Sequence, residues 1–169
     1  MGKLYSYLLV ILQVTLIILI IIYSFLRSLS FMHLFLIILG LELGVWAIIV
    51  MQKSKLRVTP DVATGAKLIK KGPYKYIRHP MYSSLLIICL GLFLTNIYSM
   101  TIFFFVFLII VLKFKIIYEE NLLKIFFPAY KNYMGRTRRL IPWIYWMPPD
   151  AVVASSSLYL SRSPREWHR

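Results

Sequence analysis

The sequence is poor in the residues that build disulfides and metal centres. Its 169 residues include one cysteine, three histidines and six acidic residues. Cys89 lies inside an apolar run, cannot form an intramolecular disulfide and is expected to be a small core residue. The histidines lie far apart, and the chain lacks the cysteine and histidine spacing typical of a zinc site. The sequence therefore predicts no metal site.

Two motifs of well-known enzyme classes are also missing. The chain has no Gly-x-Ser-x-Gly elbow, which argues against a hydrolase of that kind. It has no Gly-x-Gly-x-x-Gly segment that opens a helix after a strand, so a Rossmann dinucleotide site has no support. Any chemistry must therefore come from other residues in another arrangement.

Apolar residues are abundant instead, and they stand in long runs. The chain is 60% hydrophobic with a mean hydropathy of +0.74, whereas a soluble domain is nearer half apolar. Its net charge is +14. Because the lysines and arginines flank the apolar runs, they fit anionic lipid headgroups and membrane topology better than nucleic acid. We expect an integral membrane protein that does not bind nucleic acid.

Four apolar runs predict the helices. The first, Leu4 to Leu26, is long enough to span a bilayer and too long for a signal-peptide core, so we read it as a retained helix. The second is Leu29 to Met51. Met81 to Thr95 is short for a span, and Met100 to Leu112 can continue as a helix to Phe127. The fold class predicted is all-α: a polytopic membrane protein with about four transmembrane helices in two hairpins.

Charge predicts the orientation of these hairpins. The segment from Gln52 to Arg78 holds eight lysines and arginines against one acid, Asp61, whereas the turn from Thr95 to Ser99 is uncharged. By the positive-inside rule, both termini and the polar segments lie in the cytosol. The expected location is a bacterial inner membrane, with the functional site facing the cytosol.

Glu42 lies well inside the second span. An ionisable residue at that depth is a functional candidate by default. The alternative is a protonated glutamate that hydrogen-bonds to a neighbouring helix. We slightly favour this alternative, because no second acid or base lies near Glu42 in the sequence.

Polar chemistry is concentrated in two patches, Lys71 to Tyr82 and Lys115 to Tyr133. We expect them to meet at the membrane surface and to form one site, with connecting segments that build a cofactor pocket. Lys115 and Glu119 are four residues apart and therefore share a helix face. A histidine, adjacent acids, tyrosines and cations suit a polar, partly cationic cofactor beside a lipid-soluble substrate. Direct displacement between the two requires mainly positioning.

The two patches together resemble a known family. The motif comprises Gly72-Pro73-Tyr74, Arg78-His79-Pro80-x-Tyr82, an apolar hairpin, Glu119-Glu120, Tyr130-x-x-Tyr133 and Ile141-Pro142. In this order it resembles the isoprenylcysteine carboxyl methyltransferase family, whose group includes the phospholipid N-methyltransferases. The resemblance runs from about Arg57 to Pro142. It implies a helical membrane enzyme that transfers a methyl group from S-adenosylmethionine to a lipophilic acceptor.

The resemblance also implies site residues, although it assigns no catalytic one. Those expected at the cofactor are the main chain of Lys67, Leu68 and Ile69, and Tyr74, His79, Pro80, Met81, Tyr82 and Glu119. Lys115 and Glu120 are expected on the acceptor side. Lys115 stands where the prenylcysteine enzymes carry an arginine near the substrate carboxylate. Lysine offers a point charge and not a bidentate fork, so a carboxylate acceptor is less expected. Ser83-Ser84 replaces a glycine common in the family.

Each of these residues also has a structural interpretation. His79 could cap the helix that follows Pro80, and Glu119-Glu120 could form a solvated face. Tyr130 and Tyr133 are equally well read as interfacial anchors. Lys115 could extend to the headgroups. The cluster Arg136 to Arg139 is better read as headgroup contact than as catalysis.

Two other functions remain open at the level of the sequence. One is an NADPH-dependent membrane reductase of the sterol-reductase type, and the other is a non-catalytic membrane subunit with the same fold. Residues 1–147 are expected to form a single membrane-embedded methyltransferase domain whose motif-bearing part is 57–142. We assign the tail, 148–169, no chemistry and low order.

Overall fold

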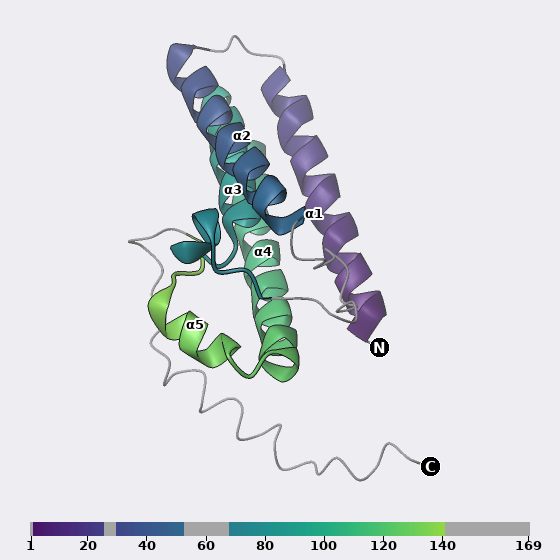
Figure 1. Ribbon diagram of the computed structural model, residues 1–169. Helices are drawn as coiled ribbons and strands as arrows, with labels where there is room; N and C mark the ends of the chain where they lie inside the picture. Colours follow the sequence, from purple (N-terminus) through teal and green to yellow (C-terminus); the bar gives the residue numbers. More distant parts are fainter. Residues whose placement is uncertain (1, 26–29, 53–67, 141–169) are drawn as a thin grey trace.

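The computed structural model describes residues 2–25, 30–52 and 68–140, and helices dominate all three stretches (Figure 1). The elements in chain order are α1 (Gly2–Phe25), α2 (Phe31–Gln52), the 3-10 helix η1 (Gly72–Lys75), α3 (Pro80–Thr95), α4 (Ser99–Phe126) and α5 (Tyr130–Arg136). Within these stretches, β pairing is limited to an isolated parallel bridge between Ile77 and Arg138. The all-α prediction is confirmed.

Three of the helices are long and apolar enough to cross a membrane. These candidate spans are Leu4–Ser24, Phe31–Gln52 and Met100–Phe126. α3 is apolar but has 16 residues, or about 24 Å at the helical rise, against a hydrocarbon core of about 30 Å. The protein is therefore a polytopic membrane protein with three candidate spans and one shorter apolar helix.

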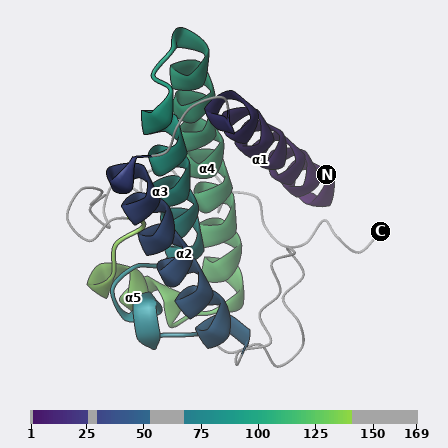
Figure 2. The ribbon, with the colours of Figure 1, turned by 90° about the horizontal axis from the view of Figure 1, so that it is seen from above.

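The long helices form a bundle, and the short elements η1 and α5 lie at one of its ends. α2 packs against α3, α3 against α4, and α1 lies against α4 and α3. Figures 1 and 2 show η1 and α5 gathered at the end of the bundle where α4 finishes, and α1 set to one side. The chain's two polar patches thus meet at a single end.

Glycines allow α2 and α3 to approach closely. A Cβ atom on Gly40 would lie 2.6 Å from Cγ1 of Ile88, and one on Gly44 would lie 2.5 Å from Oγ of Ser84. Small residues four apart on one helix are a common means of close packing between membrane helices. Ser84 therefore does not prevent the close contact between α2 and α3, because the residue that it faces on α2 is Gly44.

α1 is held to the bundle at several levels. Leu9, Leu16 and Ile20 belong to an apolar cluster with residues of α3 and α4. At the opposite end from α5, Oγ of Ser24 donates to the carbonyl oxygen of Leu92 over 2.9 Å, and Nδ2 of Asn96 donates to the carbonyl oxygen of Tyr23 over 2.7 Å. The two predicted hairpins are therefore joined at their tips.

Some expectations fall outside the described residues. They concern Lys67, the turns near Thr59 and Gly65, the segment from Ile141 and the tail from residue 148. The extent of the single domain therefore stays a prediction. The residues from Leu68 to Lys70 form neither strand nor helix.

Candidate functional site

The first half of the motif begins with a turn that requires glycine. Gly72 has a φ of +58°, a left-handed conformation that glycine adopts without strain. A Cβ atom there would also lie 2.9 Å from Cγ2 of Val50 on α2. Pro73 then occupies the first turn of η1, where a missing N–H does no harm. This turn buries Tyr74, whose hydroxyl donates to Sδ of Met51 over 3.4 Å.

The tyrosines of the second half are buried, so the interpretation as interfacial anchors is wrong. Tyr130 and Tyr133 are 1% and 6% exposed. The Tyr133 hydroxyl donates to the carbonyl oxygen of Tyr74 over 2.6 Å and so joins α5 to η1. Burial raises the pKa of Tyr74 to about 12, with a smaller contribution from Glu119, and burial also raises the pKa of Tyr130 and Tyr133. All three phenols are neutral at physiological pH.

Main-chain hydrogen bonds join the segment before α3 to the segment after α5. The N–H of Arg78 donates to the carbonyl oxygen of Arg138 over 2.7 Å, and that of His79 to the carbonyl oxygen of Arg139 over 3.0 Å. His79 occupies the N-cap position of α3, yet its side chain makes no capping hydrogen bond. The capping interpretation is therefore wrong for the imidazole.

Glu120 is the centre of a buried ionic cluster. The residue is 0% exposed. Its Oε1 accepts from Nε of Arg78 over 2.7 Å, and its Oε2 accepts from Nε of Arg139 over 3.0 Å. Nε2 of His79 lies 3.6 Å from Oε1. The solvated-face interpretation is wrong for Glu120. Headgroup contact is wrong for Arg139, which is 4% exposed.

Arg78 extends this cluster to α5. Its guanidinium also donates to the carbonyl oxygens of Met134, over 3.0 Å, and Thr137. A buried carboxylate is tolerated only where it is paired and hydrogen-bonded. The two arginines meet that requirement and fix the ends of α4, α5 and the strand-like segment before α3 relative to one another.

Glu119 differs from its neighbour because it remains accessible. Its side chain is 29% exposed, and its Oε2 lies 3.7 Å from Nδ1 of His79. The hydroxyl of Tyr82 donates to Oε1 of Glu119 over 2.5 Å. The His79 ring stacks on the Tyr82 ring, with centroids 5.5 Å apart and planes 13° apart. The two halves of the motif thus meet through side chains on α3 and α4.

Lys115 lies on the membrane side of this contact. It is 4% exposed, so it does not extend to the headgroups as the structural interpretation proposed. Its ammonium lies 5.2 Å from the centroid of the Tyr82 ring and donates to Oε1 of Gln13 on α1 over 2.9 Å. A buried cation therefore sits between the motif and the first helix.

The structure thus brings together five of the residues expected at the site, namely His79, Tyr82, Lys115, Glu119 and Glu120, hereafter the polar cluster. Tyr74 connects to it through α5, and Pro80 and Met81 form the first turn of α3 beside it. Leu68 and Ile69 lie half-buried before η1. No described hydrogen bond or ion pair joins either residue to the polar cluster.

Two residues of the site were missed at the level of the sequence. Arg139 stands in a run of arginines, and nothing in that run singles out the one that becomes buried. Gln13 did carry a signal, because it is an amide in the middle of an otherwise apolar run. Amides inside membrane helices commonly hydrogen-bond to a neighbouring helix.

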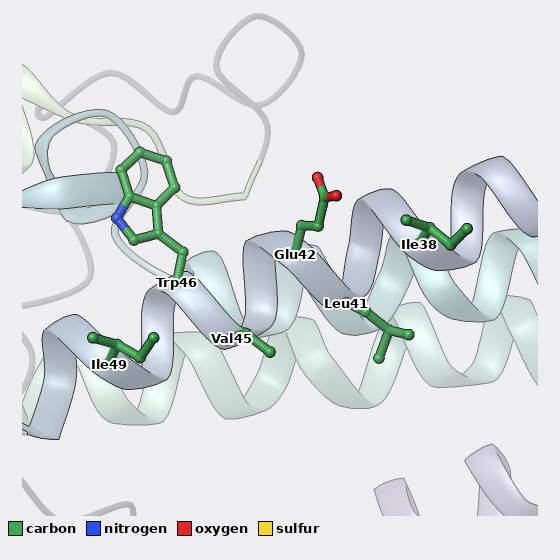
Figure 3. A pocket seen from close by; sticks show the side chains of 6 residues that line it. All are labelled: Ile38, Leu41, Glu42, Val45, Trp46 and Ile49. Carbon is green, nitrogen blue, oxygen red and sulfur yellow. The ribbon is translucent and has the colours of Figure 1, made fainter.

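A separate hollow lies on the outside of α2. Its six lining residues all come from that helix, namely Ile38, Leu41, Glu42, Val45, Trp46 and Ile49. Figure 3 shows the side chains of Glu42 and Trp46 pointing to one side of α2 and those of Leu41 and Val45 to the other. Glu42 is exposed, and no hydrogen bond links it to another described residue. The favoured interpretation, a bond to a neighbouring helix, is thus not met in the described part of the chain.

Comparison with known protein families finds a match over the middle of the chain. Residues 29–129 match the family described as phospholipid methyltransferase. This range covers α2 to α4 with His79, Tyr82, Lys115, Glu119 and Glu120, but neither α1 nor α5. Searches of curated proteins and of solved structures found no match.

The match covers more than half of the chain and contains the first half of the motif, the apolar hairpin and Glu119-Glu120 of the second half. It supports the methyltransferase prediction over the reductase and over a subunit without activity. The chain therefore belongs to the phospholipid methyltransferase family and is an integral membrane enzyme that uses S-adenosylmethionine to methylate a lipid acceptor.

Proposed function

We propose that the polar cluster is the site of methyl transfer, with His79, Tyr82 and Glu119 at the cofactor and Lys115 toward the acceptor. The observation that carries this proposal is the hydrogen bond between Tyr82 and Glu119, with His79 stacked on the same tyrosine. It joins the two halves of a motif that are separated by a whole hairpin. Because the family transfers methyl groups, we assign this contact to the methyl-transfer site.

The chemistry of these residues fits the cofactor. S-adenosylmethionine supplies a methyl group activated by a positively charged sulfur, and it also carries an ammonium group. Glu119 offers an accessible carboxylate, and hydrogen bonds to ionised groups are the strong ones. Nδ1 of His79 lies beside it, 3.7 Å from Oε2 of Glu119, whereas Nε2 of His79 lies 3.6 Å from Oε1 of the buried Glu120. The Glu119 carboxylate is thus suited to a polar, partly cationic ligand.

Other residues border the same space in this proposal. They are the main chain at Lys67, Leu68 and Ile69, and Tyr74, Pro80 and Met81. Tyr74 is a neutral phenol at physiological pH, and burial takes its pKa further from neutrality, to about 12. We assign it to binding and not to proton transfer.

For Glu120 we propose a positioning role in place of the acceptor contact expected from the sequence. Both of its carboxylate oxygens already accept hydrogen bonds from arginine. We propose that Glu120 positions His79 and the segment after α5, and that it reaches the acceptor only through them.

Depth along α4 separates the two ends of the site. Lys115 lies one helical turn from Glu119, about 6 Å nearer the start of α4. If the cofactor comes from the aqueous side, the acceptor meets Lys115 from within the membrane. A lipid that left the bilayer would lose about 25 cal/mol for each Å² of apolar surface exposed. We therefore propose lateral entry of the acceptor between the two hairpins.

Calorimetry with S-adenosylhomocysteine tests the cofactor end. In purified protein, Glu119→Gln and His79→Ala are each expected to weaken its affinity roughly tenfold, the effect of one hydrogen bond to a charged group. Glu42→Gln is the matched control, because it removes a carboxylate outside the polar cluster. NADPH should not bind. Unchanged affinity in both cluster variants, or a loss in the Glu42 variant alone, would contradict the proposed site.

A further inference from the structure

α1 lies outside the stretch that matches the family, which begins at residue 29. It nevertheless delivers a side chain to the polar cluster, because Oε1 of Gln13 accepts a hydrogen bond from the buried ammonium of Lys115 over 2.9 Å. Gln13 is half-buried and lies midway along a helix that is otherwise almost wholly apolar. This contact suggests that the first helix contributes to the choice of acceptor.

The ammonium of Lys115 has capacity for another partner. It carries three N–H donors and no acceptor. Within the described part of the chain its contacts are one hydrogen bond to Gln13 and the face of the Tyr82 ring. The Glu119 carboxylate, one turn along α4, interacts with it electrostatically but forms no direct ion pair with it among the described residues. A cation 4% exposed is costly unless it is paired with an opposite charge, and an anionic group on a ligand would supply a direct ionic partner.

Gln13 is suited to share such an anion. Its amide has an oxygen that accepts and an NH₂ group that donates. With the protein alone, the oxygen faces Lys115. When an anion binds to the ammonium, rotation of the amide would present the NH₂ group to the same anion. Lys115 and Gln13 would then form a site with donors from two helices.

α1 does not depend on Gln13 for its place in the bundle. Ser24 bonds to Leu92 and Asn96 bonds to Tyr23 at one end, and the ring of Tyr5 contacts that of Tyr118 near the other end, with centroids 5.5 Å apart. Gln13 and Lys115 can therefore bind a ligand without α1 losing the contacts that hold it in the bundle.

We propose that Gln13 is a specificity-determining residue which, with Lys115, binds an anionic group on the lipid acceptor, a phosphate or a carboxylate. The inference rests on the proposed function in one respect, that Lys115 faces the acceptor. It adds that a residue of α1, a helix outside the matched range, helps to recognise the negative charge of the acceptor.

The test uses the full chain in a nonionic maltoside detergent, with dodecyl phosphate as the probe and dodecanol as its uncharged counterpart. The wild-type protein should bind dodecyl phosphate more tightly than dodecanol. Lys115→Met and Gln13→Leu should each weaken the binding of dodecyl phosphate roughly tenfold. Thr15→Val is the matched control on α1, since its hydroxyl bonds only within the helix, and should bind as wild type does.

Gln13→Glu tests whether an anion binds at the Gln13–Lys115 pair. Its carboxylate would keep the contact with Lys115 and would place a negative charge where the anion is expected. The proposal predicts a loss of roughly tenfold or more, because the new charge repels the anion and competes for the ammonium. Wild-type affinity in this variant would overturn the inference.

Further arms identify which claim fails. Inorganic phosphate should not displace dodecyl phosphate at equal concentration, and equal competition would overturn a lipid ligand. A loss in Lys115→Met without a loss in the Gln13 variants overturns only the role of α1. If neither Lys115→Met nor the Gln13 variants weaken binding, the claim that Lys115 faces the acceptor is overturned. S-adenosylhomocysteine affinity, measured in the same samples, should stay unchanged in all of them, and a loss confined to the Gln13 variants would place Gln13 at the cofactor.

Discussion

At the scale of single residues, two adjacent glutamates have different environments. Successive residues on a helix are rotated by about 100°, so Glu119 and Glu120 face different neighbours. Glu120 turns toward Arg78 and Arg139 and is sealed from solvent. Glu119 turns toward Tyr82 and stays partly accessible. One carboxylate therefore organises the end of the bundle, and the other is available to a ligand.

Arg139→Met is expected to destabilise the protein. It leaves the buried carboxylate of Glu120 with one arginine fewer, and breaking a buried pair costs about 3–5 kcal/mol. We expect a loss near the low end of that range because Arg78 remains. Thermal unfolding in detergent measures the effect. Arg136→Met, at an exposed arginine of the same run, should unfold at the wild-type temperature, and equal losses in both variants would refute a special role for Arg139.

Sequence reasoning succeeded at the residue scale where the determinants are local. The spacing of Lys115 and Glu119 placed both on one face of α4, and both do reach Tyr82. It failed for Arg139 and Gln13, whose partners lie 19 and 102 residues away. Burial of those side chains depends on which helices come together, and neither charge pattern nor periodicity specifies that.

At the scale of elements, the contact between α2 and α3 positions the start of the motif. Gly40 and Gly44 let α3 lie against α2, and His79, Pro80 and Tyr82 occupy the beginning of α3. The helix boundaries were predictable within a few residues, since Leu4 to Leu26 was expected and Gly2–Phe25 is observed. The spacing of Gly40 and Gly44 can be seen in the sequence, but the sequence does not show which helix packs against these glycines.

Gly40→Ala is therefore expected to disturb the polar cluster indirectly, by displacing α3. Its new Cβ would lie 2.6 Å from Cγ1 of Ile88 and 3.0 Å from two backbone atoms of α3. Overpacking of this kind costs about 1–3 kcal/mol. Both the unfolding temperature and S-adenosylhomocysteine affinity should fall. Gly135→Ala is the control, because nothing lies within 4 Å of its Cβ position; a similar loss there would contradict the account.

At the scale of the whole molecule, charge divides the bundle into two ends. Cations follow α2 and accompany η1 and α5, whereas the connection between α3 and α4, at the other end, is uncharged. By the positive-inside rule we expect the charged end to lie in the cytosol. The sequence could predict this polarity because it depends on composition alone. How η1 and α5 fold against the end of α4 required the structure.

Cysteine labelling tests this orientation. Ile97 is 59% exposed and lies at the uncharged end, and Lys131 is exposed at the charged end. On a Cys89→Ala background in intact cells, Ile97→Cys should react with a membrane-impermeant maleimide, and Lys131→Cys should react only after lysis. The reverse pattern would show that the polar cluster faces away from the cytosol.

The central claim is that both halves of the motif contact one cofactor at the charged end of the bundle. The most direct measurement is photochemical cross-linking of radiolabelled S-adenosylmethionine to the purified protein, followed by protease mapping. Label is expected in two peptides, one from Leu68–Tyr82 and one from Lys115–Glu120, and excess S-adenosylhomocysteine should suppress both. Label confined to α2, around the hollow at Glu42, or to only one of the two expected peptides would contradict a single site built from both halves.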